Sequence, residues 1–178
     1  SGIGIIEDID NVVSSDLKKE GNLIYICGET KREMGGSQFF RAYNFNGGKV
    51  PVPDPAKTTK LIEKIYIAIN KNLIRACHDC SDGGFSTCIS EMAIGGRKGA
   101  EIFLSKIPSK DRKIDTYLFS ETQGRFVVEI EEKNKNSFEK IMKGSEFSCI
   151  GRVNKSNYLK FYLGRKELFS LDIELLSN

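Results

Sequence analysis

The chain has 178 residues, of which 39% are hydrophobic and 29% are charged, and its formal net charge is +3. This composition is that of an ordinary globular domain with a real core, and a small charge spread among acidic residues does not favour nucleic acid as a partner. No apolar run reaches the roughly 20 residues of a membrane span. Because we also see no signal peptide, we expect a cytoplasmic protein without a membrane partner.

The chain opens without a methionine, and its stretch IGIIED (3–8) predicts a short apolar strand. We therefore expect a fragment of a longer protein. The next apolar run, residues 22–28, is continuous and ends in glycine, which is typical of a buried strand. Ser37 follows a Gly-Gly pair and is a good N-cap for a helix that runs through residue 43.

Residues 55–72 predict a long helix after the loop NGGKVPVPDP. Asp54 suits the N-cap of this helix and Pro55 its first turn. Its apolar residues recur at helical spacing. We expect the following residues to form its buried face: Leu61, Ile62, Ile65, Tyr66 and Ile69.

The rest of the chain continues this alternation of strands and helices. A strand at 73–77 precedes a helix that starts after Gly83–Gly84 and ends at Gly95–Gly96. The elements expected beyond it are a strand at 99–104, a short helix at 115–121, a strand at 124–130, a polar helix at 133–143 and three strands in FSCIGRV, NYLKFYL and ELFSLDI.

This order of elements defines the fold class. Strands with helices between them, without repeats or an interdomain linker, indicate one α/β (α+β) domain over residues 1–178. We expect a mixed β-sheet that is covered by helices.

The chain has five cysteines at irregular spacing, and three of them, Cys27, Cys88 and Cys149, lie in apolar runs. Free, buried thiols in a reducing compartment are the plain interpretation. The other two belong to the stretch CHDCSDGG (77–84), which also carries the one histidine of the chain. This stretch admits several kinds of site.

Three kinds of site, namely a zinc site, a redox site and a nucleophile with its base, have little support. Cys77 and Cys80 have the C-x-x-C spacing of half a zinc site, but no second pair of ligands stands at a matching distance. Redox chemistry of this spacing usually sits at a helix N-terminus, whereas the helix here begins three residues later. His78 and Ser81 form a nucleophile and base only with an orienting group and an oxyanion hole, and neither is visible. A structural, hydrogen-bonded histidine is favoured.

A phosphate site fits the layout of strand, loop and helix better. Ser81 supplies a hydroxyl donor, Gly83 and Gly84 allow backbone N–H groups to approach a ligand, and the helix N-terminus favours an anion. Asp79 suits a magnesium ion carried on such a phosphate. An equally good interpretation is that Ser81 and Asp82 only cap the helix, while the glycines only turn the chain.

Two more loops have the same character. GETKREMGGS (28–37) again joins a strand to a helix through Gly-Gly, and SETQGR (120–125) joins a helix to a strand. Each loop alone is weak evidence for a ligand-binding site. We expect the three loops to meet at one rim of the domain.

The motifs CGETKREMGGSQFF, VPDPAKT, CHDCSDGGFSTCISEMAIGG, LFSETQGRFVVEI and IGRV follow in this order. Together they resemble the C-terminal domain of the AIR-synthase-related superfamily over nearly the whole chain. Within it, the combination of GET-x-x-x-x-GGS, HD-x-SDGG and LFSE-x-QGRF is most similar to the phosphoribosylformylglycinamidine synthases, and there to the second copy of the domain.

The resemblance implies an α/β/α layering and a role in a larger enzyme. That family of ligases uses ATP and glutamine-derived ammonia in purine biosynthesis. The resemblance implies ATP or ADP and Mg²⁺ as cofactors, with Asp79 on the metal and Ser81, Gly83 and Gly84 on the nucleotide phosphate. It implies the missing N-terminal domains as partners, together with a glutamine amidotransferase component and a small accessory subunit.

The family's catalytic histidine belongs to domains that this chain lacks, so we expect no catalytic residue here and no activity of the isolated domain. Cys80 stands where such loops vary, which makes its C-x-x-C spacing accidental. Two alternatives stay open. One is half of an aminoimidazole ribonucleotide synthetase, and the other is a freestanding module that binds a phosphorylated metabolite or a protein.

Overall fold

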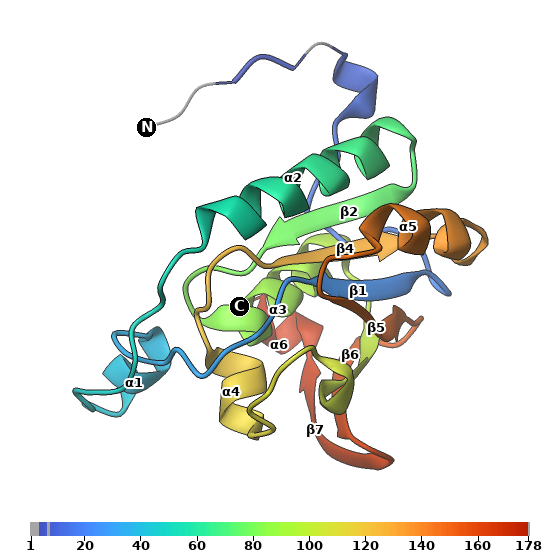
Figure 1. The fold of residues 1–178 in the computed structure, drawn as a ribbon. Coiled ribbons are helices and arrows are strands. Elements are labelled where there is room, and N and C mark those ends of the chain that lie inside the picture. Colours follow the sequence, from blue (N-terminus) through green and yellow to red (C-terminus); the bar gives the residue numbers. More distant parts are fainter. Residues whose placement is uncertain (1–3, 7, 178) are drawn as a thin grey trace.

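The computed structural model describes residues 4–6 and 8–177 and places one seven-stranded sheet between helices (Figure 1). In chain order the strands are β1 (Leu23–Cys27), β2 (Ile74–Asp79), β3 (Ala100–Phe103), β4 (Phe126–Ile130), β5 (Phe147–Val153), β6 (Tyr158–Leu163) and β7 (Lys166–Asp172). The α-helices are α1 (Gln38–Ala42), α2 (Pro55–Asn70), α3 (Gly84–Gly96), α4 (Ile114–Phe119), α5 (Lys135–Met142) and α6 (Ile173–Leu176). Short 3-10 helices are η1 (Ile9–Asn11), η2 (Leu104–Lys106) and η3 (Glu132–Asn134).

The strand order across the sheet is β2-β4-β1-β5-β3-β6-β7. The pair β3–β6 is parallel and the other pairs are antiparallel, so the predicted mixed sheet is confirmed. Strand β4 lies between β1 and β2 and runs antiparallel to both. The carboxyl ends of β1 and β2 therefore meet the start of β4 at one edge of the sheet.

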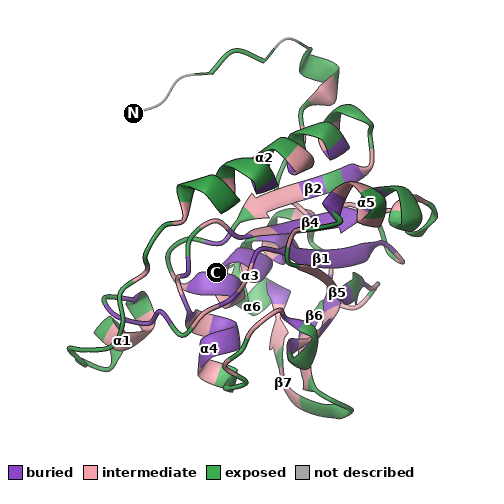
Figure 2. Cartoon of the chain, in the orientation of Figure 1, coloured by how far each residue is buried: buried purple, intermediate pink, exposed green. Residues whose placement is uncertain are grey.

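Helices cover both faces of the sheet, which confirms the α/β/α layering. On one face α2 and α5 contribute Leu61, Ile65 and Phe138 to a buried cluster. On the other face α3, α4 and α6 contribute residues such as Phe85 and Tyr117 to a second, larger cluster. Figure 2 shows the purple of buried residues concentrated in the strands and in α3 and α4.

The predicted N-caps of the first two helices are confirmed. The Ser37 hydroxyl accepts a hydrogen bond from the Phe40 N–H at 3.2 Å. The Asp54 carboxylate accepts one from the Lys57 N–H at 3.1 Å. Each cap satisfies an amide that has no partner within its own helix.

The buried face of α2 is narrower than we predicted. Leu61, Ile65 and Ala68 are buried, but Ile62 and Tyr66 are 48% and 59% exposed. The five apolar positions span two adjacent stripes of the helix, and only one stripe faces the sheet. Figure 2 shows the exposed residues along the outer side of this helix.

The strand predicted at residues 3–8 is wrong for the part that the structure describes. Residues 4–6 and 8 have no strand partner, Ile5 is 94% exposed, and the first element is η1. Residues 3 and 7 lie outside the described part. The other predicted strands are confirmed, although β2 runs two residues further than expected, to Asp79. In the described part of the chain, no helix combines the length and apolar character needed to cross a membrane.

Candidate functional site

The three polar loops meet at one edge of the sheet, as predicted. Residues 28–37 follow β1, residues 80–83 follow β2, and residues 120–125 precede β4. Backbone hydrogen bonds join them, because the Cys80 N–H donates to the Arg125 carbonyl at 2.9 Å and the Glu121 N–H donates to the Glu33 carbonyl at 3.4 Å. We call this set of loops the rim.

One carboxylate oxygen of Glu121 joins its own loop to the second loop and to the first residue of α1, directly after the first loop. This atom, Oε1, accepts hydrogen bonds from the Gly83 N–H at 2.9 Å and from the Gln38 N–H at 2.8 Å. Those amides lie at the starts of α3 and α1. Both positions favour negative charge, because helix N-termini carry unpaired N–H groups. The chain therefore supplies its own anion at the point where we expected a phosphate.

The glycine pair serves the packing of α3. Gly83 is the N-cap of this helix with φ 76°, and as a glycine it has no side chain that could accept a hydrogen bond from the amides of the first turn. The predicted capping of the helix by Ser81 and Asp82 is therefore wrong, whereas the positive φ angles of Gly83 and Gly84 agree with the other part of that alternative, in which the glycines turn the chain. A Cβ on Gly84 would lie 2.5 Å from the Ser120 carbonyl oxygen, so only glycine permits this approach to the end of α4.

The Gly84 N–H donates to the Ser81 carbonyl at 3.0 Å. Both glycine amides thus have acceptors within the chain. An anion held by the Gly83 amide would have to replace the carboxylate of Glu121.

Asp79 and Ser81 face a pocket of about 360 Å³. Asp79 is the last residue of β2, and its side chain is 61% exposed. Asp82 and Glu121 line the same pocket, together with Pro51 from the loop before α2. The pocket therefore combines carboxylate and hydroxyl oxygens on one wall of the rim.

The two cysteines of the C-x-x-C motif lie on opposite faces of the sheet. Cys80 is part of the buried cluster under α3, whereas Cys77 packs against the cluster under α2. Two side chains so separated cannot share a metal ion. Burial raises the pKa of the Cys77 thiol to about 12, with a smaller contribution from the Asp79 carboxylate.

His78 is held by neighbouring carboxylates. Its Nε2 lies 3.0 Å from Glu91 on α3, and its Nδ1 lies 3.4 Å from Asp79. Its hydrogen-bond partner on α3 fits the structural role that the sequence favoured over pairing with Ser81.

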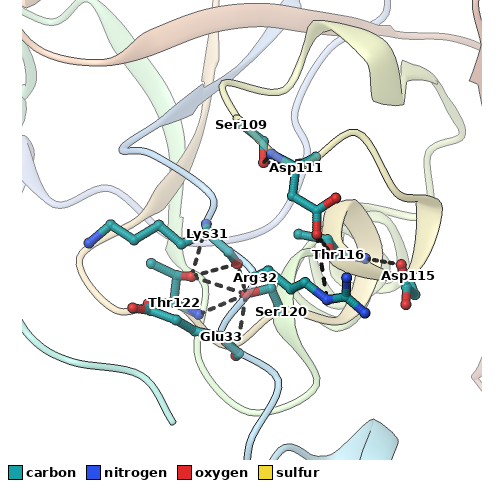
Figure 3. A network of polar contacts seen from close by, with 9 residues as sticks. All are labelled: Lys31, Arg32, Glu33, Ser109, Asp111, Asp115, Thr116, Ser120 and Thr122. Carbon is teal, nitrogen blue, oxygen red and sulfur yellow. Dashed lines mark hydrogen bonds and ion pairs between the residues drawn. The ribbon is translucent and has the colours of Figure 1, made fainter. Parts of the chain in front are cut away.

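A polar network anchors the first loop of the rim (Figure 3). The Lys31 carbonyl accepts from the Ser120 hydroxyl at 2.6 Å and from the Thr122 hydroxyl at 3.1 Å. Further along, the Arg32 guanidinium pairs with Asp111 at 3.6 Å. The loop is thereby fixed to both ends of the segment that contains α4.

Sequence reasoning missed the role of Arg125, which looked like a polar loop residue. Its side chain is fully buried beneath the rim. It donates to the Thr122 carbonyl at 2.8 Å, to the Thr30 hydroxyl at 3.0 Å and to the Ser120 carbonyl at 2.5 Å. One planar guanidinium thus holds two of the three loops, a role that its five fixed donors allow.

A second pocket, of about 410 Å³, lies beside the first, and both are bordered by Thr58, Gln123 and Gly124. Its other walls come from the start of the first loop, the first turns of α2 and residues 144–146. No sequence pattern predicts this pocket, because its walls come from four separate segments. Its charged lining residues are Glu29, Lys31, Asp54, Lys57, Lys60 and Glu146.

A known domain family matches this chain, with its mixed sheet and its rim of glycine-bearing loops. Residues 19–164 match the family model described as AIR synthase related protein, C-terminal domain. The chain belongs to this family.

Curated relatives narrow the resemblance. The chain is 37% identical over 174 residues to the phosphoribosylformylglycinamidine synthase subunit PurL of Thermococcus sibiricus, covering 97% of this chain and 24% of the relative. It is 33% identical over 175 residues to the same subunit of Methanocaldococcus jannaschii, with the same coverage. The chain thus spans about a quarter of the length of these relatives.

Solved structures share the fold. PurL of Thermotoga maritima complexed with FGAR has a TM-score of 0.86 and 22% identity, covering 96% of this chain and 30% of that one. Its complex with ADP has a TM-score of 0.80, with 22% identity over 96% of this chain and 27% of that one. The hydrogenase maturation protein HypE of E. coli is more distant, with a TM-score of 0.66 and 16% identity over 91% of this chain and 52% of that one.

Proposed function

We propose that this chain is the second AIR-synthase-related C-terminal domain of a phosphoribosylformylglycinamidine synthase. That ligase converts formylglycinamide ribonucleotide to the amidine with ATP and glutamine-derived ammonia, in purine biosynthesis. The observation that carries the proposal is the identity of 37% to a PurL subunit over 97% of the chain. The distant likeness to HypE supports the shared fold and carries no function.

In this proposal the rim forms one wall of a nucleotide–phosphate cleft, and other domains of the enzyme form the opposite wall. Solved PurL structures complexed with ADP and with ATP support nucleotide binding by such proteins. On this chain, the Ser81 hydroxyl would donate to a phosphate oxygen. The pocket that Asp79 and Ser81 line is open enough to receive one end of such a ligand.

The residues at the rim fit a magnesium ion. Asp79, Asp82 and Glu121 offer carboxylate oxygens to one pocket, and magnesium commonly binds through one or two carboxylates together with phosphate oxygens and water. In the described residues, no group of three or more possible metal ligands is close enough to hold an ion by itself. Asp79 would therefore hold the ion only together with the nucleotide, where the ion would neutralise phosphate charge.

The proposal also assigns partners. The relatives are about four times as long as this chain, so further domains of the same polypeptide complete the cleft. A solved assembly, PurLQS of Thermotoga maritima, supports accessory subunits, which we assign as the glutamine amidotransferase and a small third component.

Calorimetric titration of the full-length protein with ADP, with and without magnesium, tests the proposed site. Ser81→Ala should weaken binding by on the order of 1.5–3 kcal/mol, because it removes a charge-assisted hydrogen bond. Asp79→Ala should make the remaining affinity insensitive to magnesium. Lys155→Ala, in the turn between β5 and β6, is the matched control. If both site variants bind like the parent at both metal levels, the rim has no role in nucleotide binding.

The isolated 178-residue domain should be inactive, because the family's catalytic histidine and most of its ATP contacts lie in other domains. ATP, magnesium, formylglycinamide ribonucleotide and an ammonium salt are mixed with the domain, and ADP release is measured. Turnover above buffer that disappears in Asp79→Ala would contradict the assignment as a dependent domain.

A further inference from the structure

The segment between α1 and α2, residues 43–53, forms part of the wall of both rim pockets. Pro51 lines the pocket that contains Asp79 and Ser81, and Val52 lines the neighbouring pocket. Figure 1 shows this segment with α1 at the side of the sheet. We call it the flap. Its position sets the width of two pockets at once.

The flap is fixed to the first loop of the rim by backbone contacts at Gly35. The Gly35 N–H donates to the Lys49 carbonyl at 2.8 Å. A Cβ on Gly35 would lie 2.7 Å from the Gly48 carbonyl oxygen and 2.9 Å from the Val50 nitrogen. The two backbones are thus in direct contact, and this contact fixes the middle of the flap.

One ion pair reinforces that contact. Lys49 Nζ lies 3.3 Å from Glu33 Oε1. The Glu33 side chain is only 1% exposed, whereas that of Lys49 is 65% exposed. Among the described residues neither oxygen of Glu33 has a hydrogen-bond partner, since the lysine approaches within ion-pair distance but outside hydrogen-bond geometry. Lys49 is therefore the principal compensation for a buried charge, which is costly to leave alone.

The start of the flap is attached to α1, because the Phe45 N–H donates to the Phe40 carbonyl at 2.9 Å and the two rings pack edge to face with centroids 4.7 Å apart. Beyond Phe45 the side chains of the flap are mostly exposed. Phe45, Val50 and Val52 are between 53% and 59% exposed. Asn44, Gly47 and Gly48 have positive φ angles of 51°, 149° and 78°, which are backbone conformations typical of turns. The attachment at Gly35 and Glu33 is thus what positions the later part of the flap, which carries Pro51 and Val52.

We propose that the Lys49–Glu33 ion pair is a latch that holds the flap closed and thereby positions Pro51 and Val52 as pocket walls. Lys49 is a positioning residue that acts through the flap and does not itself line either pocket. The expectation that loss of the ion pair weakens nucleotide binding rests on the proposed function. The expectation that loss of the ion pair releases the flap does not depend on that function.

Hydrogen exchange of the full-length protein without nucleotide tests the latch. In Lys49→Met, the Gly35 amide and the flap amides should exchange at least tenfold faster than in the parent. Lys49→Arg keeps the positive charge and should restore slow exchange. Lys155→Met is the matched control, because it removes a lysine whose ion pair with Glu20, at 3.4 Å, lies on the surface away from the rim.

A double variant separates positioning from stability. Glu33→Gln with Lys49→Met removes the buried charge as well as the latch, so its melting temperature should recover relative to Lys49→Met alone, while flap exchange stays fast. ADP titration should give a several-fold weaker affinity in both variants. Parent-like exchange in Lys49→Met, or slow exchange restored in the double variant, would overturn the latch. Failure of the parent to bind ADP would instead count against the proposed function.

Discussion

The carboxylate of Glu121 accepts the N–H of Gly83 at 2.9 Å, and it does so at the first turn of α3. The same oxygen accepts the Gln38 N–H at the start of α1. A side chain from the loop before β4 thus holds the starts of two helices that follow β1 and β2. Hydrogen bonds thus hold the rim together, and a ligand that reaches it meets carboxylates, since the amides of Gly83 and Gly84 already have acceptors.

Glu121→Ala should destabilise the domain by on the order of 1–3 kcal/mol, because two backbone donors lose a charged acceptor. Urea unfolding followed by circular dichroism measures the change. Glu63→Ala, on the exposed side of α2, should shift the free energy of unfolding by less than about 0.5 kcal/mol. Equal effects of the two substitutions would show that the Glu121 contacts do not stabilise the rim.

Gly84→Ala should cost considerably more than Gly164→Ala. Both glycines have left-handed φ angles, 70° and 61°, so both substitutions carry a backbone penalty of roughly 1 kcal/mol. A Cβ on Gly84 would also meet the Ser120 carbonyl oxygen at 2.5 Å, whereas nothing lies within 4 Å of one on Gly164. The difference between the two unfolding free energies isolates the steric contact, and equal losses would mean that the end of α4 moves aside freely.

Arg125→Met should be strongly destabilising, by on the order of 2–5 kcal/mol, since it leaves buried acceptors at Thr30, Ser120 and Thr122 without a donor. Arg125→Lys should recover only part of the loss, because an ammonium cannot reproduce the planar fork of donors. Arg75→Met removes a half-exposed ion pair with Glu131 at 3.6 Å and should cost less than about 1 kcal/mol. Thermal unfolding of the three variants ranks them, and a loss for Arg125→Met as small as that for Arg75→Met would contradict the role of Arg125.

The sequence was sufficient for the seven strands of the sheet and for the meeting of the loops, although it also suggested a strand at residues 3–8 that the described residues do not form. Continuous apolar runs such as 22–28 predict buried strands because both faces of the sheet are covered by helices. The polar loops at 28–37 and 77–84 each follow a strand, so their convergence needed only that these strands run in the same direction. That condition is met because β4 lies antiparallel between them.

Other features depend on contacts that no local pattern carries. Glu33 and Arg125 are charged residues in polar loops, yet both are buried because distant segments fold over them. The exposure of Ile62 and Tyr66 follows from the orientation of α2 on the sheet. The five apolar positions of this helix form two adjacent stripes, and the sequence pattern does not specify which stripe faces the sheet. The engagement of the Gly83 amide depends on Glu121, which is 38 residues away in the sequence.

The half-buried Cys77 thiol should make the domain lose stability at alkaline pH. Its pKa rises from an ordinary value of 9.0 to about 12 in the folded state, mainly because burial disfavours the thiolate. Above pH 9 the unfolded chain releases this proton while the folded chain keeps it, so the folded state binds more protons. The stabilising contribution of Cys77 to the free energy of unfolding is therefore fully present below pH 9. It is lost as the pH rises towards 12, by up to about 1.4 kcal/mol per pH unit.

Urea unfolding of the parent and of Cys77→Ala between pH 8 and 11 measures this contribution. Cys27 and Cys88 also have raised pKa values, in both cases with burial contributing, so the parent and the variant should both lose stability with rising pH. The parent should lose more, and the two curves should converge or cross above pH 9. Curves that stay parallel over the whole range would mean that the Cys77 thiol ionises equally in both states and is less enclosed by the cluster under α2 than the structure indicates.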